Sequence, residues 1–245
     1  SDVCIKRKIR NRLLDAGENI FVQSDDKCID KCKSLKARAD ANEAFGAELK
    51  KGKKADAQRG YEIACKEWMD VRSFGQVFAF KGSDLSLGIR GPVSVQPAFS
   101  VDPIDITSMQ ITKSVNSEDK EGKSSDTMGM KHRVDFGVYI LKGSINVQLS
   151  EKTGFTEEDA EKIKEAIRTL FVNDSSSARP DGSMVMHKLY WWKHNCKIGQ
   201  YSSHKVHNSI EIKKKEGVRN PRKIEDYEII CHELPELAVE EYEGL

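Results

Sequence analysis

The segment VSVQPAFSV, residues 93–101, indicates a β-containing fold, because large and small or polar residues alternate along it. On one side of an extended chain it would place Val93, Val95, Pro97, Phe99 and Val101. A period of two residues is typical of a strand with one buried face. Proline lacks the amide hydrogen that a central strand needs, so Pro97 predicts an edge strand or a bulge.

Helices and further strands are predicted on both sides of this segment. Apolar residues at helical spacing predict a helix over residues 3–16, and Thr156 with Asp159 resembles the capped start of a second helix. Strand-like runs occupy residues 134–149, broken at Gly143, and then 185–194, 209–213 and 226–231. This order predicts an α+β fold. With one strand supplied before residue 1, it fits a ferredoxin-like or RNA-recognition-motif-like core.

Two long polar stretches interrupt the pattern. Residues 33–60 are rich in Ala, Lys, Glu and Arg, which predicts an exposed, charge-laced helical insertion or a partly disordered one. Between Thr112 and Asp126 the only apolar residue is Val115. A polar excursion of this length inside a domain is usually functional or disordered. We interpret it as a β-hairpin arm whose small apolar patch is reserved for a partner.

The composition excludes some classes of protein. The 245 residues carry 40 basic and 39 acidic side chains, and no stretch has the length and apolarity of a membrane span. Six scattered cysteines do not form the pattern of a disulfide framework, so we expect a reducing cytoplasm. The chain opens at Ser1 without an initiator methionine, and we expect the native protein to begin earlier.

The charges are segregated along the chain, which favours a polyanionic partner. Residues 5–12 carry five cations and no acid, whereas residues 233–245 carry five acids and no base. A polyanion would relieve the repulsion among those cations by releasing counterions, although a solvated helix face is the alternative. Basic residues and small polar residues recur near expected turns, at Arg72-Ser73-Phe74-Gly75, Arg90-Gly91, Lys131-His132-Arg133 and Ser177-Ala178-Arg179. Together these favour RNA, because glycine lets a phosphate approach backbone amides and arginine offers a planar fork.

Metal binding and catalysis find less support. Cys28 with Cys32 and His204 with His207 form close pairs, but nothing in their spacing brings a closed set of zinc ligands together. No nucleophile elbow or phosphate-binding Walker loop is present, so we predict neither a cofactor nor a metal. A metal-dependent ribonuclease remains the alternative function, with its acid drawn from Asp70, Asp102, Asp105, Asp126 or Asp135. The run Tyr190-Trp191-Trp192 could stack on bases or pack in the core.

Several motifs, in order, resemble the backbone-subunit family of type I-C CRISPR complexes. The motifs are Val3-Cys4-Ile5-Lys6-Arg7-Lys8-Ile9-Arg10-Asn11, Asp70-Val71-Arg72-Ser73-Phe74-Gly75, Arg90-Gly91-Pro92-Val93, Phe99-Ser100-Val101-Asp102-Pro103-Ile104, Thr127-Met128-Gly129-Met130-Lys131-His132, Ser150-Glu151-Lys152-Thr153-Gly154-Phe155 and Ser176-Ser177-Ala178-Arg179. The resemblance runs from residue 3 to about residue 190. It is loose over the insertion at 24–66 and after 195. Met130 stands where that family usually has arginine.

The resemblance implies a single palm-like domain over residues 1–245, with the helical insertion at 24–66 and a thumb hairpin at 102–131. It implies a non-catalytic subunit that polymerises with further copies of itself along CRISPR RNA. Such a subunit joins the other type I-C Cascade subunits and presents the guide for pairing with target DNA. The RNA-binding residues that we expect are Lys6, Arg7, Lys8, Arg10, Arg72, Ser73, Phe74, Arg90, Met109, Met128, Lys131, His132 and Arg179.

Overall fold

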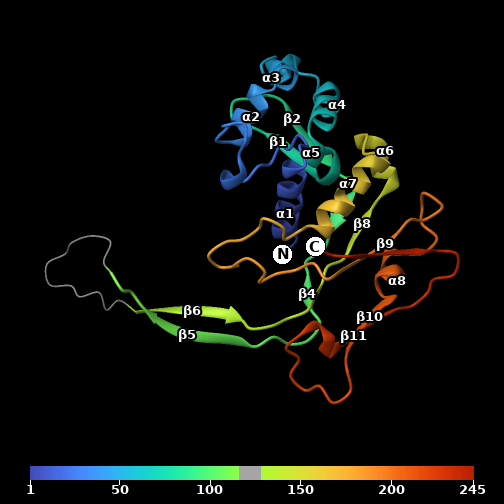
Figure 1. Ribbon diagram of the computed structural model, residues 1–245. Coiled ribbons are helices and arrows are strands. Elements are labelled where there is room, and N and C mark those ends of the chain that lie inside the picture. The colour runs from blue at the N-terminus through green and yellow to red at the C-terminus, as the bar shows by residue number, and fades with distance from the viewer. Residues whose placement is uncertain (116–127) are drawn as a thin grey trace. The chain divides into compact units, whose positions relative to one another are not determined.

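The computed structural model describes residues 1–115 and 128–245 and confirms a mixed α+β chain (Figure 1). Two compact units are formed. Unit 1 comprises residues 1–97, 142–207 and 233–245, and unit 2 comprises residues 98–141 and 208–232. Within the described ranges, each sheet has two strands, so the RNA-recognition-motif-like core stays a prediction. No helix in those ranges has both the length and the apolarity required to cross a membrane.

One core of unit 1 lies between the first helix and a later one. Helix α1, Asp2–Asp15, buries Ile9 and Leu13 against Ile163 of α7, Glu157–Arg168. The predicted capping arrangement at Thr156 is confirmed. The Thr156 side chain accepts a hydrogen bond from the Asp159 amide, and the Asp159 carboxylate accepts one from the Thr156 amide. This reciprocal cap satisfies two amides that the first turn of a helix leaves free.

The predicted insertion is helical and most of its residues are exposed, but a few of its side chains are buried in a core. Its elements are η1 Asp25–Lys27, α2 Leu35–Ala41, α3 Glu43–Leu49, η2 Gly52–Lys54 and α4 Ala57–Glu67. Phe45 is fully buried, with its ring 5.4 Å from that of Trp68 and 4.8 Å from that of Phe78. These elements therefore share a second core with the aromatic stretch that follows them, and few apolar residues suffice because that stretch supplies the large rings.

The aromatic stretch after Trp68 divides into a helix and a hairpin. Helix α5, Met69–Phe74, ends at Gly75, whose φ of 80° suits a residue without a Cβ. Strand β1, Gly75–Ala79, then pairs antiparallel with β2, Ser86–Arg90. The β-branched and aromatic side chains of residues 71–74 favour a strand by propensity alone. The helix forms because it buries Met69 in one core and Val71 in the other.

The segment at 93–101 forms two short strands rather than one. Strand β3, Val93–Val95, pairs with β8, Gly143–Ile145, in unit 1. Strand β4, Phe99–Ser100, pairs with β7, Tyr139–Ile140, in unit 2. The interruption at Pro97 agrees with the edge or bulge expected there. The predicted β region at 134–149 extended too far, because its last residues begin helix α6, Val147–Thr153.

The C-terminal part of unit 1 contains a strand that the acidic composition concealed. Strand β9, Lys188–Trp192, pairs antiparallel with β12, Val239–Glu243. Glutamates of β12 lie against Lys164 and Lys188, so the acidic tail is neutralised within the chain. A short helix, α8 Ser203–His207, precedes the segment that returns to unit 2.

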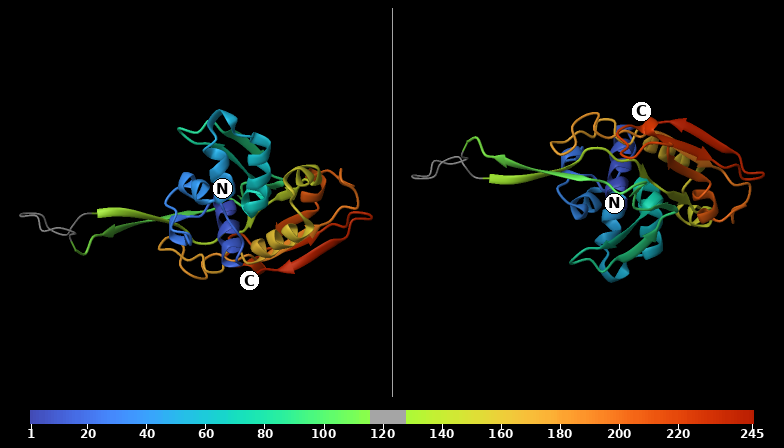
Figure 2. Two further views of the ribbon diagram at one scale, coloured as in Figure 1. Left: turned by 90° about the horizontal axis from the view of Figure 1, so that it is seen from above. Right: turned by 90° about the horizontal axis from the view of Figure 1, so that it is seen from below.

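Besides the β4–β7 pair, the described residues of unit 2 form two hairpins. The predicted arm is a hairpin of β5, Ile106–Thr112, and β6, Met128–Val134, and the strands run side by side in both views of Figure 2. It extends to Val134, beyond the expected end at 131. The connecting residues 116–127, including Asp126 and Thr127, lie outside the described residues. The second hairpin joins β10, Ile210–Lys214, to β11, Tyr227–Cys231, through η3, Ile224–Asp226.

Candidate nucleic-acid interface

Helix α1 presents its basic residues at different depths. Arg7 is exposed, and the Lys6 side chain is 26% exposed. The Lys8 side chain is only 2% exposed, is ion-paired with Asp174 and has its ammonium 5.5 Å from the centre of the Phe171 ring. Burial, followed by the positive charge of Arg179, lowers the pKa of Lys8. The predicted phosphate contact of Lys8 stays a prediction, and it would require Asp174 to give up its partner.

A polar hollow lies between α1 and the loop at 172–179. It is lined by Arg7, Asn11 and Arg12 on the helix and by Arg179 on the loop, and three carboxylates also line it, those of Asp15, Asp26 and Asp174. The Arg179 Nε atom is buried and makes no hydrogen bond within the described residues, and its nearest carboxylate oxygen, on Asp174, is 3.8 Å away. A buried charged donor without a hydrogen bond is costly. An anionic oxygen in this hollow would supply the missing acceptor.

Arg10 is held on the opposite flank of α1 by a buried carboxylate. Its Nε donates to Asp70 at 2.9 Å, and its guanidinium lies 5.0 Å from the centre of the Phe74 ring. Asp70 is fully buried and also accepts from the amides of Phe21 and Val22. Arg10 and Phe74 were both predicted RNA-binding residues, and the fold brings them together around Asp70.

Arg72 connects α5 to the start of α7. Its Nε and Nη2 atoms donate to the two Asp159 oxygens at 2.9 and 2.7 Å. Burial acts to raise the pKa of Asp159, but the hydrogen bonds from Arg72 and from the Thr156 amide outweigh it and lower that pKa. Because 17% of the Arg72 side chain is exposed, the guanidinium lies just below the surface.

The segments that contain Gly75 and Gly91 lie directly against each other in the structure. Gly75 pairs with Arg90, and a Cβ on Gly91 would lie 2.2 Å from the Ser73 carbonyl oxygen. These glycines therefore permit close approach of two protein backbones, whereas the sequence suggested an opening for phosphate. Ser73 is buried in the last turn of α5 and donates to the Met69 carbonyl at 2.6 Å. Arg90, at the end of β2, is exposed.

The hairpin has two chemically different faces, because directly paired residues share a face. The methionine face carries Ile106 with Val134, Met130 and Met128, all at least 43% exposed. The basic face carries Lys131, Arg133 and Met109. Thus Met109 and Met128, both predicted to bind RNA, lie on opposite faces. Lys131 and His132 are divided likewise, and His132 Nδ1 shares a hydrogen bond of 2.8 Å with Ser108 Oγ.

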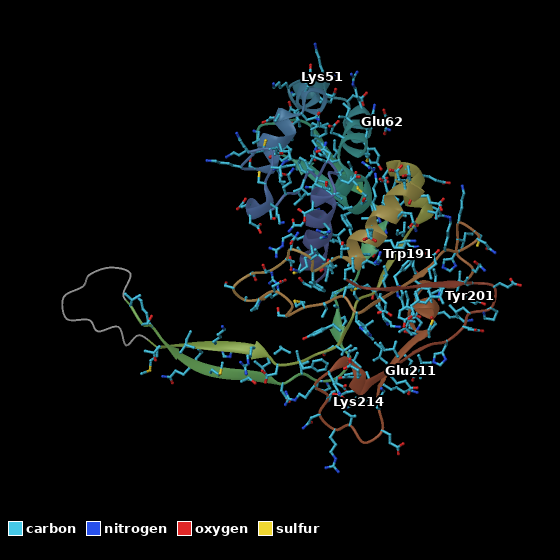
Figure 3. All side chains as sticks on the ribbon, viewed as in Figure 1. Lys51, Glu62, Trp191, Tyr201, Glu211 and Lys214 are labelled. Carbon is cyan, nitrogen blue, oxygen red and sulfur yellow. The ribbon has the colours of Figure 1, made fainter. Side chains whose placement is uncertain are left out.

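The remaining candidates occupy structural positions. In the described ranges, no group of three or more His, Cys, Asp or Glu residues could hold a metal ion. The Cys28 thiol hydrogen-bonds to Asp30 and to the Cys32 carbonyl. Tyr190 and Trp192 stack on each other with centroids 6.2 Å apart, and the Lys164 ammonium covers the Trp191 ring at 5.4 Å (Figure 3).

A cationic helix, an arginine whose Nε atom has no hydrogen-bond acceptor among the described residues, and a hairpin with exposed methionines are typical of a protein that holds a nucleic-acid strand. The chain belongs to the family of the CRISPR-associated protein Cas7, whose model matches residues 1–232. Members of this family form the backbone of the Cascade complex, bind CRISPR RNA and are in general non-catalytic. No curated protein matches the chain.

Proposed function

We propose that this chain is the repeated backbone subunit of a type I-C CRISPR surveillance complex. Copies polymerise along one CRISPR RNA and leave guide segments free to pair with target DNA. The subtype rests on the motifs quoted above. The observation that carries RNA binding is the hollow beside α1, where the buried Arg179 Nε has no hydrogen-bond acceptor among the residues that the structure describes.

The exposed cations of unit 1 make the direct phosphate contacts. Arg7 and Arg179 line the same hollow, and Lys6 lies one residue away from Arg7 on α1. Arg90 adds an exposed guanidinium at the end of β2. A subunit that accepts any spacer must rely on backbone contacts and on shape, because base-edge contacts would restrict the guide sequence. Recognition of the target is then left to base pairing, as in other guided systems.

The buried cations hold this surface in place. Lys8 fixes the loop that bears Asp174, Arg10 supports the Phe74 ring, and Arg72 joins α5 to α7. Each has a carboxylate partner inside the protein. They therefore contribute to RNA binding by holding neighbouring side chains in position. Ser73 has the same role, because its hydroxyl donates to the backbone of α5.

The hairpin serves as the thumb that displaces guide bases at intervals. Met128 presents its side chain from the methionine face, and Met109 and Lys131 present theirs from the basic face. Bases would meet the polarisable thioethers, and Lys131 would meet phosphate. His132 is tied to Ser108 across the strands, and it would contact RNA from the methionine face.

The test is mass photometry of the full chain with single-stranded RNAs of increasing length, at low and high salt. We expect the bound copies to increase stepwise without cleavage. Arg7→Glu combined with Arg179→Glu should abolish the growth, whereas Lys50→Glu with Lys53→Glu, which has the same charge change at exposed positions, should not. A fixed one-to-one complex would favour a simple adaptor. Shortened RNA would instead establish the ribonuclease.

A further inference from the structure

A second concentration of positive charge lies in unit 2, on the hairpin of β10 and β11. Residues 213–223 read KKKEGVRNPRK and carry six cations against one acid, Glu216. Figure 3 marks Lys214 at the end of β10, where this loop begins. The proposed function assigns no role to these residues.

The loop is held in one conformation by Asp226. The Asp226 carboxylate accepts from the amides of Arg222 at 2.7 Å and Lys223 at 3.2 Å, and the Lys215 amide donates to the Asp226 carbonyl at 2.9 Å. The bond from the Arg222 amide is the main cause of a lowered pKa for Asp226. The carboxylate therefore remains charged and keeps the loop closed. Cations held in this way lose less conformational entropy when they bind.

The nearby carboxylates are occupied by other partners. Asp102 accepts from the Tyr227 hydroxyl at 2.8 Å and is ion-paired with Lys214 at 3.2 Å. Asp135 accepts from Thr107 and from Arg133, each at 2.7 Å. By contrast, within the described residues no ion pair joins a carboxylate to Lys215, Arg219 or Arg222. These three side chains remain available to an external anion.

The cations border a hollow that also contains aromatic surface. Arg219 and Arg222 line it together with Phe136 and Tyr227, whose ring centres are 6.5 Å apart. Tyr227 is buried and Phe136 is half-buried, so of these two rings Phe136 offers its surface to a base or a sugar, and arginine offers paired donors to a phosphate. Asp102, Asp105 and Asp135 also line the hollow, so a phosphate would be confined to the arginine side by repulsion.

The hollow adjoins the base of the thumb hairpin, because Asp135, which lines the hollow, directly follows β6. Arg133 of that face is bonded to Asp135, and the positive charge of Arg222 contributes to the lowered pKa of the same carboxylate. A row of cations thus leads from Lys131 and Arg133 to Arg222 and Arg219. All of these residues belong to unit 2, so the row does not depend on how the two units are placed.

We propose that the β10–β11 loop is a second binding site for a single-stranded phosphodiester backbone, separate from the α1 hollow. Lys215, Arg219 and Arg222 contact successive phosphates, and the hollow beside Phe136 accepts a base or a sugar. RNA and DNA share this backbone chemistry, and the experiment below distinguishes them. The proposal rests on unit 2 alone and requires neither polymerisation nor the type I-C subtype.

The test compares three versions of the full chain by fluorescence anisotropy. These are the wild type, the loop variant Lys215→Glu, Arg219→Glu, Arg222→Glu, and a control, Lys50→Glu, Lys53→Glu, Lys54→Glu, with the same charge change at exposed positions. Labelled oligouridine RNA and oligothymidine DNA are titrated between about 50 and 200 mM salt. Three lost phosphate contacts should reduce the slope of log K against log salt by about 2, and weaken binding on the order of 100-fold at 0.1 M salt.

Each outcome decides the proposal. If the loop variant binds both the RNA and the DNA more weakly, the loop is a general site for the phosphodiester backbone. If it binds only one of the two more weakly, that nucleic acid is the ligand. If the loop variant keeps the slope of the control on both strands, the proposal is overturned. The pair Arg7→Glu, Arg179→Glu is measured in parallel. If the Arg7→Glu, Arg179→Glu variant binds more weakly and the loop variant does not, this inference is overturned and the α1 site stands. If only the loop variant binds more weakly, this inference stands and the α1 assignment fails.

Discussion

The ion pair between Arg72 and Asp159 provides the sharpest test of whether a motif arginine contacts RNA or holds the fold. We compare Asp159→Asn, Arg72→Gln and the double variant. Removing one partner of a buried ion pair costs about 3–5 kcal/mol, because a charge is left without its partner. Since 17% of the Arg72 side chain is exposed, water can partly solvate what remains. We therefore expect each single change to cost about 2–3 kcal/mol in the free energy of unfolding.

The assay is thermal and urea unfolding. In a protein of this length, a loss of 1 kcal/mol lowers Tm by roughly 2–4 °C, so each single variant should melt roughly 4–12 °C below the wild type. The double variant should cost less than the sum of the two single changes, since neither charge is then left alone. The reasoning would be refuted if both single variants unfolded within about 0.5 kcal/mol of the wild type.

The same variants separate structure from RNA binding. If Arg72 only holds the fold through its ion pair with Asp159, Arg72→Gln and Asp159→Asn should lower the RNA affinity of the folded protein by the same amount, or leave it unchanged. If Arg72 instead contacts phosphate, Arg72→Gln should weaken RNA binding, whereas Asp159→Asn, which frees the guanidinium, should preserve or strengthen it. Only the second result would restore Arg72 as a direct ligand.

The pH dependence of this pair follows from the lowered pKa of Asp159. A carboxyl group whose pKa is lower in the folded state than its ordinary value of 3.8 stabilises the protein above that value. The contribution is lost as the pH falls through the folded-state pKa. The difference in stability between the wild type and Asp159→Asn should therefore be complete at pH 7 and diminish below about pH 4, measured as urea midpoints at each pH.

Three further outcomes follow from local geometry. Gly91→Ala should strongly lower the Tm or prevent folding, because its Cβ would lie 2.2 Å from a main-chain oxygen, whereas Gly88→Ala, whose Cβ meets nothing within 4 Å, should melt like the wild type. Burial, and then the nearby carboxylate of Asp102, raises the pKa of Tyr227 to about 12, so the phenolate absorbance in wild-type minus Tyr227→Phe spectra should titrate near that pH. Its stabilising effect should be complete below pH 10 and lost toward pH 12. Met128→Ser combined with Met130→Ser should change the free energy of unfolding by less than about 0.5 kcal/mol, because both side chains are exposed. The same double variant should reduce RNA-dependent growth of the complex.

Much of the fold was accessible from periodicity and capping. The helix at 3–16, the capped helix at Thr156 and the strands near 188, 210 and 227 were predicted because each depends on neighbours in sequence. The core formed by Phe45, Trp68 and Phe78 could not be predicted in this way, because it brings Phe45 to two partners that lie more than twenty residues away along the chain. Strand β12 was missed since its glutamates resemble a solvated tail until Lys164 and Lys188 are placed beside them.

The candidate site was also predictable only in part, because some of its properties depend on residues that are distant in the sequence. Residue type identified cations suited to phosphate, and the exposure of Arg7 and Arg90 agrees with that interpretation. Composition could not reveal that Lys8, Arg10 and Arg72 each face a carboxylate, because Asp174, Asp70 and Asp159 lie between 60 and 166 residues away along the chain. The unsatisfied nitrogen of Arg179 is likewise visible only in three dimensions.

The pairing of β5 with β6 also constrains how this arm can change in length during evolution. Side chains alternate between the faces, so the loss or gain of one residue within β6 would turn Lys131 and Arg133 to the side that now carries Met128 and Met130. A change of two residues would preserve both surfaces. Natural relatives that keep a two-faced arm should therefore differ in strand length by even numbers of residues, with odd changes confined to the turn that joins the strands.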